Sequence, residues 1–124
     1  MNIFLDSDIV IEVLRSRDQA ILSEWDALAN TDGEILFSPI TAAEIWAGAR
    51  PHEYADISNF FRPLTCLPIS HEVGETAGQF MRRYRKSHSL EVPDAIIAAS
   101  AVVTEGRLWT LNRKHFPMPE LSLY

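Results

Sequence analysis

Short apolar runs alternate along the chain with longer segments whose apolar residues recur at helical spacing. Runs of this length, bounded by polar turn residues, are typical of strands that are buried in a sheet. The sequence therefore predicts four strands. They are Asn2–Leu5, Glu34–Phe37, Cys66–Ile69 and Leu108–Leu111.

Amphipathic segments lie between these runs and predict six helices. The first begins at Ile9, and the others span residues 20–28, 39–48, 52–61, 73–84 and 94–104. Strands that alternate with helices indicate βαβ units. The chain is therefore expected to be a single α/β domain, with a mostly parallel central sheet of four or five strands flanked by helices.

Polar residues able to bind a cation fall where such a sheet places its ligands. Asp6 ends the first strand, Glu44 lies in the helix after the second, Asp94 begins the helix that leads to the last strand, and Asn112 follows that strand. With right-handed crossovers, all four lie at the carboxyl edge of the sheet. Carboxylates gathered there repel one another unless a hard cation such as Mg²⁺ binds them.

Local roles are an alternative explanation for these residues. Asp6 or Ser7 is suited to cap the first helix. Glu44 fits a capping box with Thr41, whereas a cap at Ser38 leaves Glu44 free in the second turn. The sequence does not decide between these two arrangements.

Asp94 is also a favourable acid for the first turn of a helix, because the helix dipole is positive there. The residues that follow, 95–103, are apolar on almost every side and predict a buried helix. A carboxylate at the mouth of a buried helix needs a partner, which favours a functional role.

Composition narrows the class of protein. The 124 residues are 47% hydrophobic and 23% charged, which suits one globular domain, and no apolar stretch is long enough to cross a membrane. The single cysteine, Cys66, excludes an internal disulfide, and we expect it to be a buried thiol in a cytoplasmic protein. Trp25, Trp46 and Trp109 are interpreted as core residues.

Charge is unevenly distributed. A formal net charge of −6 argues against a protein that holds nucleic acid by charge alone, although bound cations would reverse the local sign. Four of the eleven basic residues lie within Arg82–Lys86. Cations at the end of a helix can simply stabilise its dipole and remain solvated, which is the alternative to a binding role.

Four segments in order resemble the successive motifs of PIN-domain proteins, and most closely those of VapC-type toxins of prokaryotic toxin–antitoxin pairs. They are FLDSDIVIEVL, SPITAAEIWAGA, VPDAIIAASA and LWTLNRKHF. The resemblance covers nearly the whole chain and implies one PIN domain over residues 1–124. It also implies an Mg²⁺- or Mn²⁺-dependent ribonuclease that is inhibited by a cognate antitoxin and often forms a homodimer.

On this resemblance, Asp6, Glu44 and Asp94 fall on the three principal acids, which serve as catalytic residues and metal ligands. Thr110 falls on the strand-end hydroxyl. Asn112 falls on the fourth acidic position, which is often Asp. An amide oxygen there can still bind a metal or a metal-bound water, so Asn112 is expected among the catalytic residues. It brings no charge, however, so the resemblance leaves a complete second metal site in doubt.

Further residues belong to the surroundings of the implied site. Asp8, beside Ser7, takes a small polar position that can supply a ligand or an outer contact. His115 stands where Asp or His often precedes Phe. With metal bound, the basic residues are expected to guide the RNA backbone without reading its sequence. They are Arg82, Arg83, Arg85, Lys86, Arg113 and Lys114.

Two other functions remain as hypotheses. Asp6-Ser-Asp8-Ile-Val10 matches the opening motif of haloacid dehalogenase-type phosphatases, which form a phosphoaspartate. That family also needs a downstream Lys and a further acidic motif, and only Lys86 and Lys114 are present. A catalytically weak or inactive PIN-like module that binds RNA or protein is the second hypothesis, and Asn112 favours it.

Overall fold

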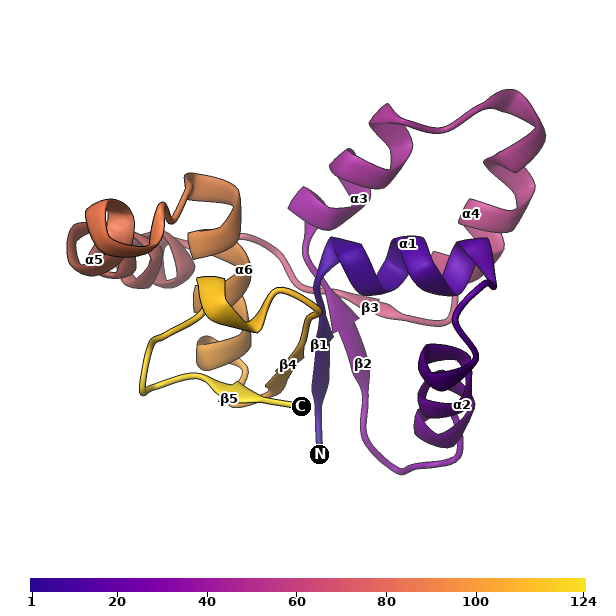
Figure 1. Cartoon of the computed structure of the whole chain (residues 1–124), viewed down its shortest axis with the longest axis horizontal. Helices are drawn as coiled ribbons and strands as arrows, with labels where there is room; N and C mark the ends of the chain where they lie inside the picture. Colours follow the sequence, from indigo (N-terminus) through magenta and orange to yellow (C-terminus); the bar gives the residue numbers. More distant parts are fainter.

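The computed structural model describes residues 1–124 and contains one five-stranded sheet in which every neighbouring pair is parallel (Figure 1). The strand order is β3-β2-β1-β4-β5, with β1 at the centre. The strands are β1 (Ile3–Leu5), β2 (Ile35–Phe37), β3 (Thr65–Cys66), β4 (Arg107–Trp109) and β5 (Ser122–Leu123). The expected parallel α/β sheet is confirmed.

Six α-helices surround the sheet. They are α1 (Ser7–Arg15), α2 (Gln19–Leu28), α3 (Pro39–Ala47), α4 (Tyr54–Phe61), α5 (His71–His88) and α6 (Val92–Val103). Two 3₁₀ turns, η1 (Pro51–Glu53) and η2 (Arg113–His115), complete the chain. None of the helices combines the length and apolar character needed to cross a lipid bilayer.

The alternation of side chains along β1 divides the core into two clusters. Phe4 packs with residues of α5 and α6 on one face, whereas Ile3 and Leu5 pack with residues of α1 to α4 on the other. Figure 1 shows the same division, with α5 and α6 on one side of the sheet and α1, α2 and α4 on the other. Because β1 is covered on both faces, its three residues are all buried and apolar.

Two strands differ from the prediction. β5 was not among the four predicted strands, because two residues, Ser122 and Leu123, are too short a pattern to recognise. β3 is limited to Thr65 and Cys66, and the chain does not continue as a strand through Pro68. The last backbone hydrogen bond that joins this segment to β2 runs from the Leu67 N–H to the Phe37 carbonyl at 2.9 Å.

Two side chains that were expected in the core are exposed. Cys66 lies on the edge strand β3 and is exposed, so the prediction of a buried thiol was wrong. Trp46 is 40% exposed and packs against Tyr54, which is 47% exposed, with ring centroids 5.7 Å apart. Trp109 is buried as expected.

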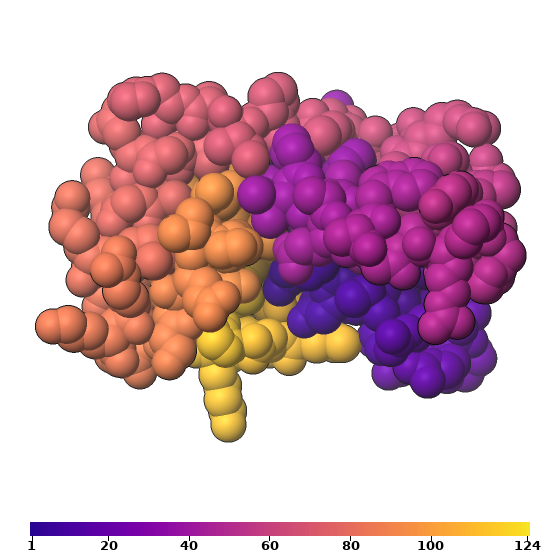
Figure 2. All heavy atoms as spheres, turned by 90° about the horizontal axis from the view of Figure 1, so that it is seen from above, coloured from indigo at the N-terminus to yellow at the C-terminus, as the bar shows by residue number.

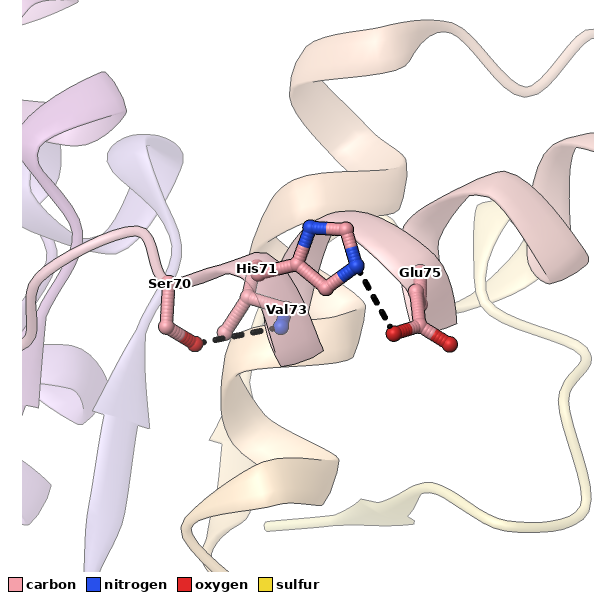
Figure 3. Close-up of polar contacts among 4 residues, drawn as sticks. All are labelled: Ser70, His71, Val73 and Glu75. Carbon is pink, nitrogen blue, oxygen red and sulfur yellow. Dashed lines mark hydrogen bonds and ion pairs between the residues drawn. The ribbon is translucent and has the colours of Figure 1, made fainter.

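Helix α5 begins where local hydrogen bonds satisfy its first turn (Figure 3). The Ser70 hydroxyl accepts a hydrogen bond from the Val73 N–H at 3.2 Å, and His71 Nε2 lies 2.9 Å from Glu75 Oε1 one turn further on. The cap stabilises the helix by about 1 kcal/mol, whereas the exposed His71–Glu75 pair adds little. The helix ends at Ser89, whose φ of 52° is left-handed.

The loop before β2 is packed too closely to accept a side chain at Gly33. A Cβ on Gly33 would lie 1.5 Å from the carbonyl oxygen of Met1, whereas Gly78 in α5 has open space. We expect Gly33→Ala to lower the free energy of unfolding by about 1–3 kcal/mol in urea denaturation, because the N-terminus must shift. Gly78→Ala is the control and should raise it by about 0.5–1 kcal/mol. Equal stability of the two variants would contradict this account of the loop.

Candidate active site

Asp6 lies at the carboxyl end of β1 and is 7% exposed. It is the N-cap of α1, and its Oδ1 accepts a hydrogen bond from the Ser7 N–H at 2.8 Å. Its Oδ2 accepts one from the Thr110 hydroxyl at 2.7 Å, and its backbone N–H donates to the Trp109 carbonyl at 3.0 Å. The cap and the buried acidic group are thus the same residue.

Thr110 joins the end of β4 to this carboxylate. Its hydroxyl donates to Asp6 and accepts a hydrogen bond from the Asn112 N–H at 3.0 Å. The same oxygen lies 3.3 Å from Asp8 Oδ2. Because one hydroxyl faces both carboxylates, Asp6 and Asp8 lie side by side at the sheet edge.

Asp8 connects the first turn of α1 to the chain after β4. Its Oδ2 accepts a hydrogen bond from the Leu111 N–H at 3.0 Å. Its Oδ1 is buried and has no hydrogen-bond partner. Burial, and then the charge of Asp6, raises the pKa of Asp8 to about 6. A bare buried carboxylate oxygen is costly unless a donor or a cation meets it.

Glu44 reaches the site from α3. Ser38 caps this helix, since its hydroxyl accepts from the Ile40 N–H at 3.1 Å, and Pro39 is the first helical residue. The capping box with Thr41 is therefore not formed, and the Thr41 hydroxyl is buried without a partner. Partial burial, followed by the charges of Asp6 and Asp94, raises the pKa of Glu44, while the nearby Ser7 hydroxyl opposes the shift.

Asp94 lies in the first turn of α6, whose residues 95 and 97–101 are buried as predicted. Burial is the main reason that the pKa of Asp6 is raised, and the charge of Asp94 raises it further. The Thr110 hydroxyl, the Ser7 N–H and the charge of His115 act in the opposite direction. The charge of Asp94 thus acts on both Asp6 and Glu44, and the charge of Asp6 acts on Glu44, as expected for acids gathered at one edge.

The surface above the strand ends is recessed. Viewed from above in Figure 2, indigo residues from the start of α1 are visible between the magenta segment of α3 and the orange segment around the start of α6. No three His, Cys, Asp or Glu side chains converge as a ready-made cation cage. Glu44 contributes to this, because its side chain is exposed rather than turned toward the buried Asp6 carboxylate.

Two other residues that were predicted near the site, His115 and Asn112, differ in how deeply their side chains are buried. His115 belongs to η2, and its Nδ1 is buried without a hydrogen-bond partner. Asn112 is exposed and its carboxamide makes no hydrogen bond, so only its backbone N–H joins the site. The structure brings Asp6, Asp8 and Thr110 together but not the side chain of Asn112.

The predicted RNA-binding residues are exposed and follow two patterns. Arg83 pairs with Glu120 at 2.6 Å, and Arg113 donates to the Tyr124 carbonyl at 2.9 Å. The other four have no ion-pair partner. They are Arg82, Arg85, Lys86 and Lys114. Because α5 leads through three residues into α6, the basic end of α5 adjoins in sequence the helix that carries Asp94.

A groove beside the acids was not anticipated from the sequence. It has a volume of about 230 Å³, lies among α1, α3 and α4, and extends to Glu44. Its apolar lining includes Ile11, Ile45 and Ile57, and Glu53 adds an acidic rim. These three isoleucines come from three different helices, so the groove depends on how the helices pack, which the periodicity of one segment does not report.

These features describe a parallel α/β protein with a carboxylate-rich site at the carboxyl edge of its sheet. A family model described as the PIN domain matches residues 3–118. Over 119 residues the chain is 36% identical to Ribonuclease VapC10 of Mycobacterium tuberculosis, covering 95% of this chain and 88% of that protein. The chain belongs to the PIN-domain family.

Solved structures support the same fold. A toxin–antitoxin complex from Klebsiella pneumoniae contains a chain that is 26% identical, with a TM-score of 0.77 and coverage of 95% of this chain and 93% of that one. VapBC2 from Rickettsia felis, bound to a DNA fragment from its promoter, aligns with a TM-score of 0.84 over 100% of this chain and 98% of that one. At 21% identity, the second likeness concerns the fold alone.

The donors at the site suit a hard divalent cation. Carboxylate oxygens are the ligands that Mg²⁺ and Mn²⁺ prefer, and Asp8 Oδ1 is buried without a well-formed hydrogen bond, although the Ile9 N–H of the same turn lowers the pKa of this carboxyl group. Burial is the main cause of the raised pKa values of Asp6 and Glu44, and the negative charge of neighbouring carboxylates raises both values further. A cation at this edge would meet the Asp8 oxygen and would offset the negative charge around Asp6 and Glu44.

The raised pKa of Asp8 predicts a pH dependence of stability in EDTA. Below about pH 6 the folded protein holds a proton on Asp8 that the unfolded chain releases near the ordinary value of 3.8. The folded state therefore binds more protons between these values, and its stability falls as pH rises through them. We expect a loss of roughly 1–3 kcal/mol between about pH 4 and pH 6, allowing for solvent screening.

The measurement is urea denaturation of the wild type and Asp8→Asn across this range. The difference between the two proteins isolates Asp8 from the other carboxylates. The variant should gain relative stability as pH rises. A difference that is constant with pH would show that the Asp8 charge is not disfavoured in the folded state.

Proposed function

We propose that this protein is a metal-dependent endoribonuclease and the toxin of a toxin–antitoxin pair. The observation that carries the proposal is the buried carboxylate of Asp6, surrounded by Asp8, Glu44 and Asp94 at the carboxyl edge of the sheet. The relative Ribonuclease VapC10, with 36% identity over nearly the whole chain, supports the same activity.

In this proposal Asp6, Glu44 and Asp94 hold Mg²⁺ or Mn²⁺. When bound, the cation lowers the pKa of a water molecule and offsets negative charge on the phosphodiester that is cleaved. The Ser7 N–H and the Thr110 hydroxyl fix the orientation of the Asp6 carboxylate. The Asn112 N–H in turn orients the Thr110 hydroxyl. Asp6 is thus held in position before any ligand arrives.

RNA is the proposed substrate, and the unpaired cations of α5 and η2 are the proposed backbone contacts. Arg82, Arg85 and Lys86 are exposed and adjoin the helix that carries Asp94. Arg83 is a weaker candidate, because its guanidinium is held by Glu120 and lies over the Phe80 ring. Such contacts position RNA without reading its sequence.

A cognate antitoxin and a second copy of this chain are the proposed protein partners. The groove among α1, α3 and α4 is lined by apolar residues, by three acidic residues and by one basic residue, Arg15. The acidic residues are Glu44, Glu53 and Asp56. Those features suit an antitoxin segment that carries apolar and basic side chains. The likeness to a chain of a solved toxin–antitoxin complex supports this partner class.

An inactive binding module is the second candidate function, and the exposed, uncharged Asn112 favours it. The retained buried Asp6 and its acidic neighbours argue against it. A phosphoaspartate phosphatase is less well supported, because Asp6 is occupied by the Thr110 hydroxyl and the Ser7 N–H.

Removing one acid tests the proposed activity. We expect Asp6→Asn and Asp94→Asn each to lose Mn²⁺ binding in calorimetry and to lose cleavage of structured RNAs in gels, because each removes a charged ligand. EDTA should abolish cleavage by the wild type. Asp6→Asn should also unfold at a temperature at least as high as that of the metal-free wild type, since like-charge repulsion falls.

The control is Asp26→Asn, which removes an exposed charge on α2 away from the site. It should bind Mn²⁺ and cleave RNA like the wild type. Cleavage that persists in EDTA or in a folded Asp94→Asn variant would refute the metal-dependent mechanism.

The basic end of α5 gives a separate prediction. Replacing Arg82, Arg85 and Lys86 with Gln should weaken RNA binding for all sequences and reduce the slope of its salt dependence by about one per lost phosphate contact. Arg83→Gln is the matched control, because its charge is already paired with Glu120. Binding should be measured by fluorescence anisotropy at several salt concentrations. An unchanged slope in the triple variant would mean that these cations are a solvated helix end.

A further inference from the structure

The segment after β4 contributes no carboxylate to the acidic site. Residues 110–115 are Thr, Leu, Asn, Arg, Lys and His, so their side chains are neutral or basic. Asn112, the residue there with an amide oxygen, is exposed and makes no side-chain hydrogen bond. Any negative charge beside the end of β4 must therefore come from another element.

Helix α1 supplies that charge through Asp8. The carboxylate reaches across to the segment after β4, where Oδ2 meets the Leu111 N–H at 3.0 Å and lies 3.3 Å from the Thr110 hydroxyl. Asp6 meets the same hydroxyl from the other side at 2.7 Å. Two carboxylates of one helix turn thus flank Thr110.

The two oxygens of Asp8 are in unlike environments. Oδ2 has both contacts with the segment after β4, whereas Oδ1 is buried and has no partner. Holding the loop requires only one acceptor oxygen, which an Asn side chain at this position would also provide. A structural role therefore explains Oδ2 but leaves the charge and the bare Oδ1 without an explanation.

We infer that Asp8 is a further cation ligand, whose Oδ1 supplies at the end of β4 the carboxylate oxygen that Asn112 does not. The inference rests on the proposed metal-dependent function and extends its ligand set beyond Asp6, Glu44 and Asp94. A hard divalent cation is the group that satisfies a buried carboxylate oxygen beside a second carboxylate. The charge of the site is then provided by α1 twice and by α3 and α6 once each.

The experiment moves this charge between two positions and measures Mn²⁺ binding by calorimetry and by the electron paramagnetic resonance of free Mn²⁺. Asp8→Asn keeps an acceptor for the Leu111 N–H and removes only the charge. We expect its affinity for Mn²⁺ to fall by at least about tenfold. Combining Asp8→Asn with Asn112→Asp should recover most of the lost affinity, because a carboxylate returns to the end of β4.

Controls separate failure of this inference from failure of the proposed function. Asp26→Asn should bind Mn²⁺ like the wild type, which excludes a general effect of net charge. Wild-type affinity in a folded Asp8→Asn variant, together with lost binding in Asp6→Asn, would overturn the inference and leave the proposed function standing. A wild type that binds no Mn²⁺ would overturn both.

A stability measurement and a further variant distinguish the loss of a ligand from a folding defect. Thermal unfolding in EDTA should show that Asp8→Asn is as stable as the wild type near neutral pH or more stable. Should it not fold, Asp8→Glu keeps the charge and moves it by one methylene. Retained Mn²⁺ binding that is weaker than in the wild type supports the inference, and binding unchanged from the wild type contradicts it.

Discussion

The buried carboxylate of Asp6 is the constraint on which the rest of the site depends. Removing a carboxylate from water is costly, and here only one N–H and one hydroxyl compensate it. Both donors come from elements that the parallel sheet brings together, since Ser7 begins α1 and Thr110 follows β4. The site therefore exists only when β1 and β4 are paired, which links the acidic chemistry directly to folding.

The fold supplies this arrangement by placing β1 at the centre of the sheet with a core cluster on each face. Helices α3 and α6 then bring Glu44 and Asp94 to the same edge. Burial raises the pKa of Asp6 and of Glu44, the charge of Asp94 raises both further, and the charge of Asp6 adds to the shift of Glu44. Acids held this way destabilise the metal-free protein. Under the proposed function, a bound cation would offset this negative charge, and its binding energy would then add to the stability of the folded protein.

Sequence patterns predicted the elements that have strong periodicity and the acids at their ends. Asp6 was identified because it follows a recognisable strand, Asp94 because it begins a recognisable helix, and Glu44 because it lies within the helix after the second strand. The pattern did not reveal β5, which has two residues, or the exposure of Cys66, since the edge position of β3 depends on strand order. It missed the exposure of Trp46 as well, because the packing of its helix is not set by local periodicity. It also left the choice between Ser38 and Thr41 as the cap of α3 open, because both fit the local chemistry. The contact of Asp8 with Leu111 spans 103 positions and depends on the register of β1 and β4.

The most direct test of this account is the anomalous diffraction of a crystal soaked in Mn²⁺. The account predicts an anomalous peak at the carboxyl edge of the sheet, within bonding distance of the Asp6 and Asp94 carboxylates, with the side chain of Glu44 drawn in from the rim. The same map shows directly whether Asp8 Oδ1 contacts an ion. Full occupancy of Mn²⁺ elsewhere on the protein, with no peak beside Asp6, would contradict the claim that the buried carboxylates form a cation site.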